Sequence, residues 1–145
     1  MRPEFRKLRI QQLERSMEAF QSARKIQRPP KGWIRALREA SGMTLREFAM
    51  RMKSSIPSAA KFEKSEAEYR ITLNSLRRAA EALGCELIYA LVPKQGSILD
   101  LAEHRAREEA ANDVQSVEHT MALEDQGVGG VEQKIEEETK RKLRR

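Results

Sequence analysis

The side chains in this sequence that could do chemistry are mainly lysines and arginines, and the chemistry they offer is ionic binding. The 145 residues include 28 Lys and Arg against 22 Asp and Glu, which gives a net charge of +6. This charge is unevenly distributed, because residues 1–93 carry +9 and residues 94–145 carry −3. A basic body of this kind indicates either an anionic partner, most commonly nucleic acid, or a well-solvated surface.

Side chains for bond-making chemistry do not occur in a pattern typical of an enzyme. The sequence contains no glycine-rich phosphate-binding loop, no HExxH motif and no Ser/His/Asp set in a recognisable context. Cys85 is the only cysteine, which excludes an intramolecular disulfide and a zinc site built from cysteines. His104 and His119 have no cysteine nearby, so no metal site is expected. We expect a protein that is not an enzyme and that uses no cofactor or small-molecule ligand.

Proline and glycine positions divide the chain into three predicted regions. Residues 1–30 form an N-terminal extension, residues 31–93 a compact helical domain, and residues 94–145 an acidic tail. The extension contains a helix over residues 4–27, which ends before two prolines that cannot continue it. Its narrow apolar stripe needs a covering surface from its own domain, a second subunit or another protein. The stripe consists of Ile10, Leu13, Met17 and Phe20.

Four short helical patterns follow between residues 32 and 83. We expect Trp33 to anchor the first of them in the core. The second starts after Thr44, whose hydroxyl can form a capping box with Glu47. The third carries Pro57 in its first turn, where the missing N–H group costs nothing. These signals predict a bundle of short helices.

Residues 86–92 predict a β-strand that is buried on both faces, because apolar residues occupy both sets of alternating positions and Pro93 follows them. A single strand cannot satisfy its own backbone hydrogen bonds, and no second strand is visible in the sequence. We therefore expect the same strand of a second subunit to pair with it, which makes the protein a homodimer. The dimer interface predicted in this way consists of Leu87, Ile88, Tyr89, Ala90 and Leu91.

The acidic tail has a weaker pattern. Ser97 with Asp100 marks a helix start, and residues 98–124 are compatible with a helix that the sequence Gly-Val-Gly-Gly at 127–130 would break. Residues 131–145 predict disorder or a marginal helix. No apolar run approaches the ~20 residues that span a bilayer, and the N-terminus lacks a secretory signal, so we expect a cytoplasmic protein.

The segment 42–64 contains a short helix, a tight turn and a second short helix. Ala49 lies where two helices cross closely, and Ala59 and Phe62 face the first helix. This is the helix-turn-helix arrangement, whose second helix enters the DNA major groove. The segment resembles the Xre/Cro-type helix-turn-helix family without a gap, and the resemblance extends over residues 32–84. It implies a mainly α fold of four to five bundled helices.

The same resemblance implies which side chains meet DNA. Ser55 would cap a recognition helix over residues 55–64, and Glu63 would occupy a structural acid position. The base contacts implied are Ile56, Pro57, Ser58 and Lys61. The phosphate contacts implied are Thr44, Arg46, Arg51, Lys53, Ser55 and Lys64, with Arg35 and Arg38 as further candidates.

The sequence departs from the family pattern at three places. Lys53 stands where the turn usually has glycine, so either a non-glycine residue has a positive φ or the turn is longer. Leu45 replaces a polar residue that often touches phosphate. The recognition helix also lacks the Gln or Arg that reads a base with two hydrogen bonds. We therefore expect modest base readout and a large phosphate share of the affinity.

A narrower resemblance covers residues 5–93. It rests on Leu-Arg-Ile-Gln-Gln-Leu (8–13), Pro-Pro-Lys-Gly-Trp-Ile-Arg (29–35) and the run from Leu76 to Pro93. Together with the helix-turn-helix, these motifs are similar to the family called mobile mystery protein A. Its members are typically encoded on mobile elements beside a Fic-domain partner, which implies an antitoxin-like or autoregulatory role.

These observations lead to one main hypothesis and two alternatives. The main hypothesis is a sequence-specific transcriptional repressor that binds double-stranded operator DNA as a homodimer and is associated with the nucleoid. The second is a protein-interaction module that neutralises a toxin-like, Fic-type enzyme through its N-terminal helix or C-terminal tail, with DNA binding secondary. The third is a nucleoid protein that binds DNA without sequence preference, as the weak base-reading chemistry would allow.

Overall fold

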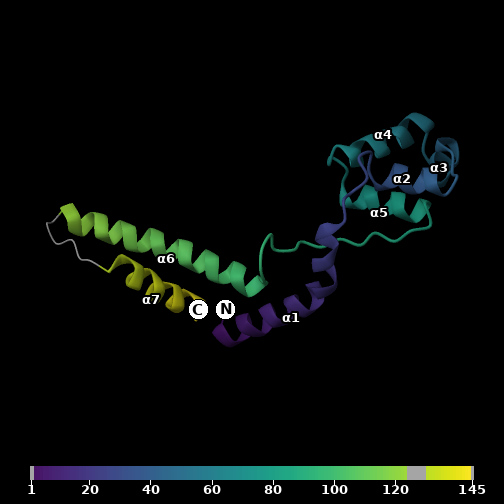
Figure 1. Ribbon diagram of the computed structural model, residues 1–145. Coiled ribbons are helices and arrows are strands. Elements are labelled where there is room, and N and C mark those ends of the chain that lie inside the picture. Colours follow the sequence, from purple (N-terminus) through teal and green to yellow (C-terminus); the bar gives the residue numbers. More distant parts are fainter. Residues whose placement is uncertain (1, 124–129, 145) are drawn as a thin grey trace. The chain divides into compact units, whose positions relative to one another are not determined.

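The computed structural model describes residues 2–123 and 130–144, without the side chains of residues 118–123. Within those ranges the chain forms seven α-helices and one 3-10 turn, so the expectation of a mainly α fold is confirmed (Figure 1). The contacts divide it into two compact units. One unit comprises residues 24–90, and the other combines residues 1–23 with residues 91–145.

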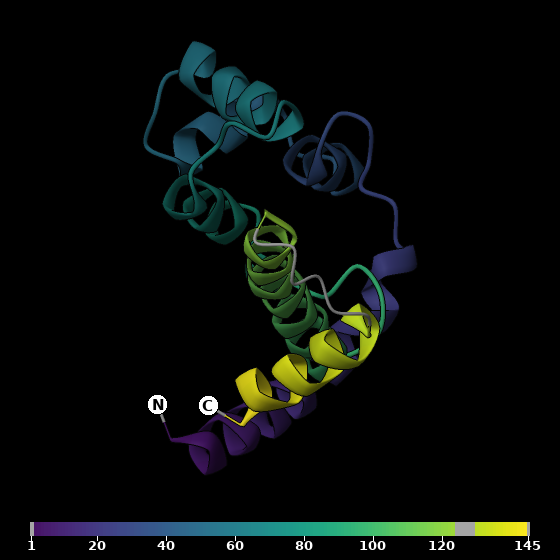
Figure 2. The same cartoon turned by 90° about the vertical axis from the view of Figure 1, so that its left-hand side faces the viewer.

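The unit of residues 24–90 is a bundle of four short helices (Figures 1 and 2). They are α2 (Trp33–Ala40), α3 (Leu45–Arg51), α4 (Ile56–Ala67) and α5 (Leu73–Ala82). The capping box predicted for α3 is present: the Thr44 hydroxyl accepts from the Glu47 N–H at 3.1 Å, and the Glu47 carboxylate accepts from the Thr44 N–H at 3.3 Å. The hydroxyls of Ser55 and Thr72 cap α4 and α5 in the same way. The helix starts therefore follow from local sequence.

The core of this unit is small and contains several alanines. Ala49 of α3 and Ala59 of α4 are buried at the crossing of the two helices, as the sequence predicts. Trp33 is not the anchor we expected, because 45% of its surface is exposed and the neighbouring Ile34 is buried instead. The first turn of α2 thus rotates its smaller apolar side chain inward. The buried cluster consists of Ile34, Phe48, Ala49, Met52, Ala59, Ala79 and Ala82.

The C-terminal end of α4 is fixed by Arg28. Its guanidinium donates to the carbonyl oxygens of Glu66 at 2.7 Å and Ala67 at 2.9 Å, and it lies 3.8 Å from the centre of the Tyr69 ring. The Glu66 carbonyl oxygen also accepts from the Tyr69 N–H at 3.1 Å, so Arg28 adds a second donor there. Carbonyl oxygens in the last turn lack helical N–H partners, and a cation at this end complements the negative end of the helix dipole. Arg28, although it precedes α2, is therefore part of the structural support of α4.

The β-strand predicted over residues 86–92 is not present in the described chain. Residues 85–93 have no regular secondary structure, and Ile88, Tyr89 and Leu91 are between 67% and 88% exposed. The physical reason is that a strand exists only when a neighbouring strand satisfies its N–H and C=O groups. The described residues of a single chain offer no second extended segment. The strand prediction is wrong for the isolated chain.

The second unit is built from three helices. They are α1 (Pro3–Gln21), α6 (Ile98–Leu123) and α7 (Val131–Leu143). The predicted start of α6 is confirmed, since the Ser97 hydroxyl accepts from the Asp100 N–H at 3.1 Å and the Asp100 carboxylate accepts from the Ser97 N–H at 2.8 Å. The side chain of His119 and the residues Gly127 and Gly129, which entered the sequence predictions, lie outside the described residues.

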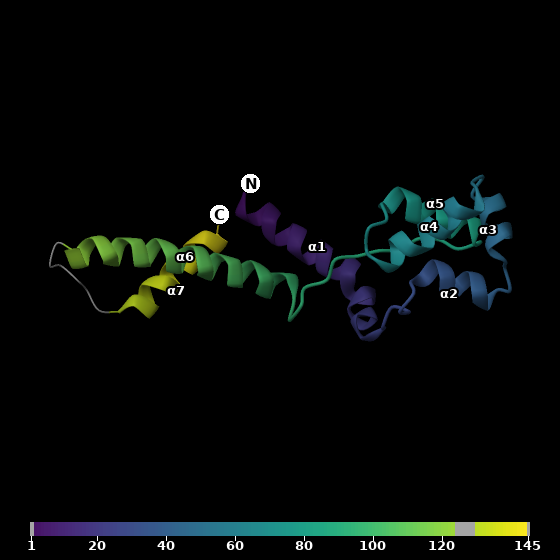
Figure 3. The same ribbon diagram turned by 90° about the horizontal axis from the view of Figure 1, so that it is seen from above.

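Helix α7 runs antiparallel along α6 (Figures 1 and 3). Ile135 of α7 is buried against Ala110 and Val114 of α6. The ammonium of Lys142 donates to the Asp113 carboxylate at 2.9 Å, and this hydrogen bond raises the pKa of Lys142. The part of the tail from Val131 to Leu143 is therefore helical and packed against α6. No helix in the described ranges is long and apolar enough to cross a membrane.

Lys53 lies in the turn between α3 and α4 with a φ of 54°. Of the two alternatives left open by the missing turn glycine, a positive φ at a non-glycine residue is therefore the one observed. A positive φ strains the backbone of Lys53, because its Cβ atom approaches the following carbonyl oxygen.

We predict that Lys53→Gly raises the free energy of unfolding by about 1 kcal/mol, because glycine relieves this strain. Urea unfolding followed by the fluorescence of Trp33, the single tryptophan, measures the change. Lys53→Ala is the matched control, because it removes the same amine but keeps the Cβ atom. A Lys53→Gly protein no more stable than Lys53→Ala would contradict the prediction.

Candidate nucleic-acid interface

Helix α4 is presented by a rigid local frame. The turn from α3 closes through a hydrogen bond from the Ser54 N–H to the Ala49 carbonyl oxygen at 2.9 Å. Ser55 then caps α4, with its hydroxyl accepting from the Ser58 N–H at 3.2 Å and lying 2.9 Å from the Ser58 hydroxyl. The first turn of α4 is thus held by side-chain hydrogen bonds before any ligand is bound.

The two faces of α4 differ sharply in burial. Ala59, Glu63 and Glu66 face inward and are at most 8% exposed. The opposite face is exposed and contains all four side chains expected to contact bases. Its members are Ile56, Pro57, Ser58, Ala60, Lys61 and Lys64. Pro57, Ala60 and Lys61 follow Ile56 by one, four and five residues, and this spacing places them on the same side of the helix.

Ala60 is a member of this face that the sequence reasoning missed. It is exposed and lies one turn after Ile56 and one turn before Lys64. The helical period alone contained this signal, since position i+4 shares the face of position i. A small apolar side chain at this place leaves room for a base edge and can contact a thymine methyl group.

Two grooves flank α4, and both contain cations. On one side, Lys31 and Arg35 line a groove together with Lys64. On the other side, Lys61 and Arg70 line a groove that also contains hydroxyl groups. These hydroxyls belong to Ser58, Ser65, Thr72 and Ser75. Lysine, arginine and hydroxyl side chains are the usual partners of DNA phosphates, so both grooves have suitable chemistry for the two strands beside a major groove.

Lys31 and Arg70 were also missed by the sequence reasoning. They lie outside the helix-turn-helix segment itself, and only the packing of the chain brings them beside α4. No local spacing rule connects residue 31 to residue 64, so the sequence offered no signal for this proximity.

The six residues expected to contact phosphate are all exposed, but they are not equally placed. Thr44 and Ser55 lie at the N-terminal ends of α3 and α4, where N–H groups also face outward. Arg51 is directed elsewhere, because its guanidinium donates to the Ala82 carbonyl oxygen at the end of α5 at 3.4 Å. The others, Arg46, Lys53 and Lys64, are exposed on α3, the turn and α4.

The two further candidates on α2 already have carboxylate partners. Arg38 forms an ion pair with the buried Glu63, and its guanidinium also donates to the Met43 carbonyl oxygen at 3.1 Å. Arg35 donates to the exposed Glu39 at 2.8 Å, a hydrogen bond that raises the pKa of Arg35 and lowers the pKa of Glu39. Arg38 is therefore a structural cation that holds α2 against α4, whereas Arg35 can exchange its exposed partner.

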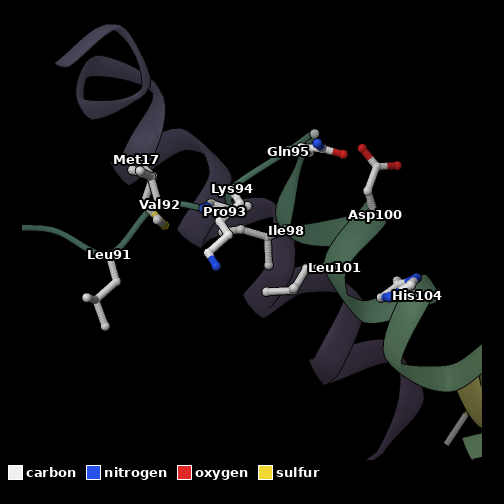
Figure 4. Close-up of a pocket in the computed structure, with 11 residues that line it drawn as sticks. Met17, Leu91, Val92, Pro93, Lys94, Gln95, Ile98, Asp100, Leu101 and His104 are labelled. Atoms are coloured by element: carbon white, nitrogen blue, oxygen red, sulfur yellow. The ribbon is translucent and has the colours of Figure 1, made fainter. Parts of the chain in front are cut away.

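A second candidate site is an open apolar groove in the unit that contains α1 and α6 (Figure 4). Figure 4 shows Met17 of α1 beside Val92 and Pro93 of the connecting chain, with Leu101 and His104 of α6 further along. Side chains of Ile98 and Leu91 complete the apolar lining. The described residues contain no group of three or more His, Cys, Asp or Glu that could hold a metal ion.

Comparison with known proteins identifies one domain. Residues 34–89 match the family model described as helix-turn-helix, of the Xre type. The chain therefore contains an Xre-type helix-turn-helix domain, a DNA-binding and non-enzymatic kind of domain, and the α3-turn-α4 geometry fits it. No curated protein and no solved structure matched the chain.

We predict that Arg38→Ala lowers the free energy of unfolding by about 3 kcal/mol, because it leaves the buried Glu63 carboxylate without its cation. Urea unfolding followed by Trp33 fluorescence measures this loss. Arg35→Ala removes a cation of the same helix whose partner is exposed, so the urea midpoint should hardly change. Equal destabilisation by both substitutions would show that the Arg38–Glu63 pair has no special structural role.

Proposed function

We propose that this protein is a sequence-specific transcriptional repressor, an antitoxin-like autoregulator that binds operator DNA as a dimer through the recognition helix of residues 55–64. The observation that carries the proposal is the exposed face of α4, which lies between two grooves lined by cations. The bound dimer would cover a promoter, that of its own gene in the autoregulatory case, and so act by steric exclusion in the cytoplasm at the nucleoid.

The chemistry of this face favours a particular balance of contacts. Ile56, Pro57 and Ala60 offer only apolar contacts, which suit thymine methyl groups, and Ser58 is already hydrogen-bonded to its cap. Lys61 is the cation of this face that we propose to contact a base edge, whereas Lys64 is proposed to contact phosphate. Base readout is therefore modest, and contacts with the phosphates supply a large part of the affinity.

Dimeric binding follows from the geometry of operators. A single α4 covers one half-site, and a two-fold dimer reads two half-sites separated by about 10 base pairs or a multiple of that spacing. The surface that we propose for dimerisation is the apolar segment Leu87, Ile88, Tyr89, Ala90 and Leu91, in which Leu87 is half-buried and the other four residues are exposed. Its exposure in the single chain supports this choice, since an apolar patch rarely stays in water without a partner.

We predict that the wild-type protein prefers its own upstream DNA over a scrambled duplex by at least ~10³, as specific operators require. Fluorescence anisotropy at two salt concentrations measures both affinities. The double substitution Ser58→Ala with Lys61→Ala should weaken operator binding by roughly 1–3 kcal/mol, because it removes the polar base contacts. Lys140→Ala on α7, which removes the same charge outside the helix-turn-helix unit, is the control.

Two outcomes would contradict this assignment. If the double variant binds the operator as the wild type does, α4 is not the recognition helix. If both duplexes bind equally and lose affinity steeply with salt, the protein is a non-specific nucleoid protein, because phosphate contacts alone then carry the affinity.

A second candidate function is capture of a protein partner, and a specific observation favours it. Helix α1 is 19 residues long and has no buried residue, so its apolar stripe is incompletely covered by the described chain. Met17 of this stripe also lines the apolar groove of Figure 4. An amphipathic helix of this kind gains most of its stability from a packed surface. The partner proposed here is a toxin-like, Fic-domain protein that the chain would neutralise.

We predict that Leu13→Glu with Met17→Glu abolishes co-purification of a co-expressed Fic-domain protein from the same genome, because the stripe becomes charged. Glu18→Gln on the outer face of α1 is the control. Operator binding should be unchanged in both variants. A deletion of residues 1–28 is less suitable, because it would also remove the hydrogen bonds of Arg28 to the C-terminal end of α4. Undiminished capture by the doubly charged variant would exclude the stripe as the docking surface.

A further inference from the structure

The connecting segment of residues 85–93 combines two features that are costly in water. No backbone hydrogen bond joins residues 86–93 to any other described part of the chain. Three large apolar side chains are also exposed there, with Ile88 and Tyr89 at 67% and Leu91 at 88%. An extended apolar segment with unpaired N–H and C=O groups is a template for pairing with another strand.

The charges around this segment are arranged symmetrically and have opposite sign. Glu86 precedes seven uncharged residues, and Lys94 follows them. In an antiparallel pair of identical segments, the acidic end of one copy meets the basic end of the other at both ends. A parallel pair would place the two glutamates together and the two lysines together, which is unfavourable. The charge pattern therefore favours a second copy in antiparallel orientation.

We propose that two copies of this chain form an antiparallel two-stranded ribbon centred on Ala90, in which Glu86 of each copy lies opposite the second copy's Lys94. The proposal rests on the dimer of the proposed function and deepens it by fixing the occupant, direction and register of the interface.

Symmetry limits the registers that are possible. In an antiparallel ladder, opposite residues alternate between hydrogen-bonded and non-hydrogen-bonded pairs. A two-fold axis maps each pair onto a second pair with the two residues exchanged, so both pairs must be of the same kind. Because successive pairs alternate in kind, the axis cannot lie between two successive pairs and must pass midway between one residue and the same residue of the other copy. Centres at Ile88, Tyr89 and Leu91 place Glu86 opposite uncharged residues. Only the centre at Ala90 places it opposite Lys94.

Pro93 agrees with this register. It lies opposite Leu87 when the centre is Ala90, three positions from the axis. If the Ala90 pair is hydrogen-bonded, the Pro93 pair is of the non-hydrogen-bonded kind, in which the N–H group points away from the partner strand. The N–H group that proline lacks is therefore not needed in the ladder.

The same register groups the apolar side chains of the segment by face. Leu87, Tyr89 and Leu91 alternate onto one face, where Tyr89 lies directly opposite Leu91 of the second copy in a close, non-hydrogen-bonded pair. Aromatic and aliphatic side chains in such pairs stabilise a sheet. Ile88 and Val92 lie opposite each other on the second face, with the small Ala90 on the axis. Every large apolar side chain of the segment thus gains a cross-strand neighbour.

A charge exchange in the full chain tests the ends of the ribbon. Glu86→Lys and Lys94→Glu should each raise the dimer dissociation constant about tenfold, because each creates two like-charged pairs per dimer. The combined Glu86→Lys, Lys94→Glu protein should return to within about threefold of the wild type. Glu81→Lys, an equal charge change on the exposed side of α5, is the control. Dilution series in sedimentation experiments measure the constants, and additive losses in the combined variant would overturn the register.

Cysteine cross-linking tests the centre. In a Cys85→Ser background, Ala90→Cys should form an intermolecular disulfide on mild oxidation, because Cα atoms of a hydrogen-bonded pair lie about 5.5 Å apart. Ile88→Cys should not, because the two copies of residue 88 would be about 13 Å apart in this register. Cross-linking at 88 but not at 90 would overturn the register. Fluorescence anisotropy with operator DNA on the same proteins separates the failure of the ribbon from the failure of the proposed function. If the wild type binds its operator as a monomer, the ribbon is overturned and DNA recognition by α4 remains. If the cross-linked dimer shows no preference for the operator, the repressor function is overturned.

Discussion

Two buried carboxylates on the inner face of α4 are the constraint on which the DNA-binding unit depends. Glu63 and Glu66 are one turn apart and at most 8% exposed, so each needs partners that replace water. Arg38 of α2 supplies the partner for Glu63. Glu66 accepts from Arg28 at 2.9 Å and from the Ile34 N–H at 2.8 Å. These contacts connect α4 to the chain before and within α2, and they set its rotation about its own axis.

The same contacts explain why the chain enters α2 as it does. Gly32 has a φ of 87°, and a Cβ atom there would lie 2.5 Å from the Glu66 carboxylate. Only glycine allows both the backbone conformation and this close approach. Because the inward side of α4 is occupied by carboxylates and their partners, the outward side can present lysines and small side chains without internal competition. The electrostatics of the interface are thus a consequence of how the core is closed.

The rest of the molecule buries fewer of its apolar side chains than this unit does. Among the described side chains, the α6–α7 pair buries only a few and α1 buries none, and the segment that connects the units leaves Ile88, Tyr89 and Leu91 exposed. A small core supplies little stability. The unit that contains α1, α6 and α7, together with the connecting segment, therefore has the properties of an assembly surface.

Local sequence determined the helices and their starts, because capping boxes, the first-turn proline and helical periodicity act within four residues. It also indicated the exposed face of α4, and the period alone would have added Ala60. At Lys53 it left two alternatives open, and only the structure shows that the residue has a positive φ. The tertiary structure decided which cations take part. Arg38 is occupied by Glu63, Arg51 is directed to the end of α5, and Lys31 and Arg70 lie beside α4. The prediction of a β-strand was wrong for a related reason. A strand needs a second segment to pair with, and the sequence contains only one such segment. Interactions between residues far apart depend on packing, which no local pattern encodes.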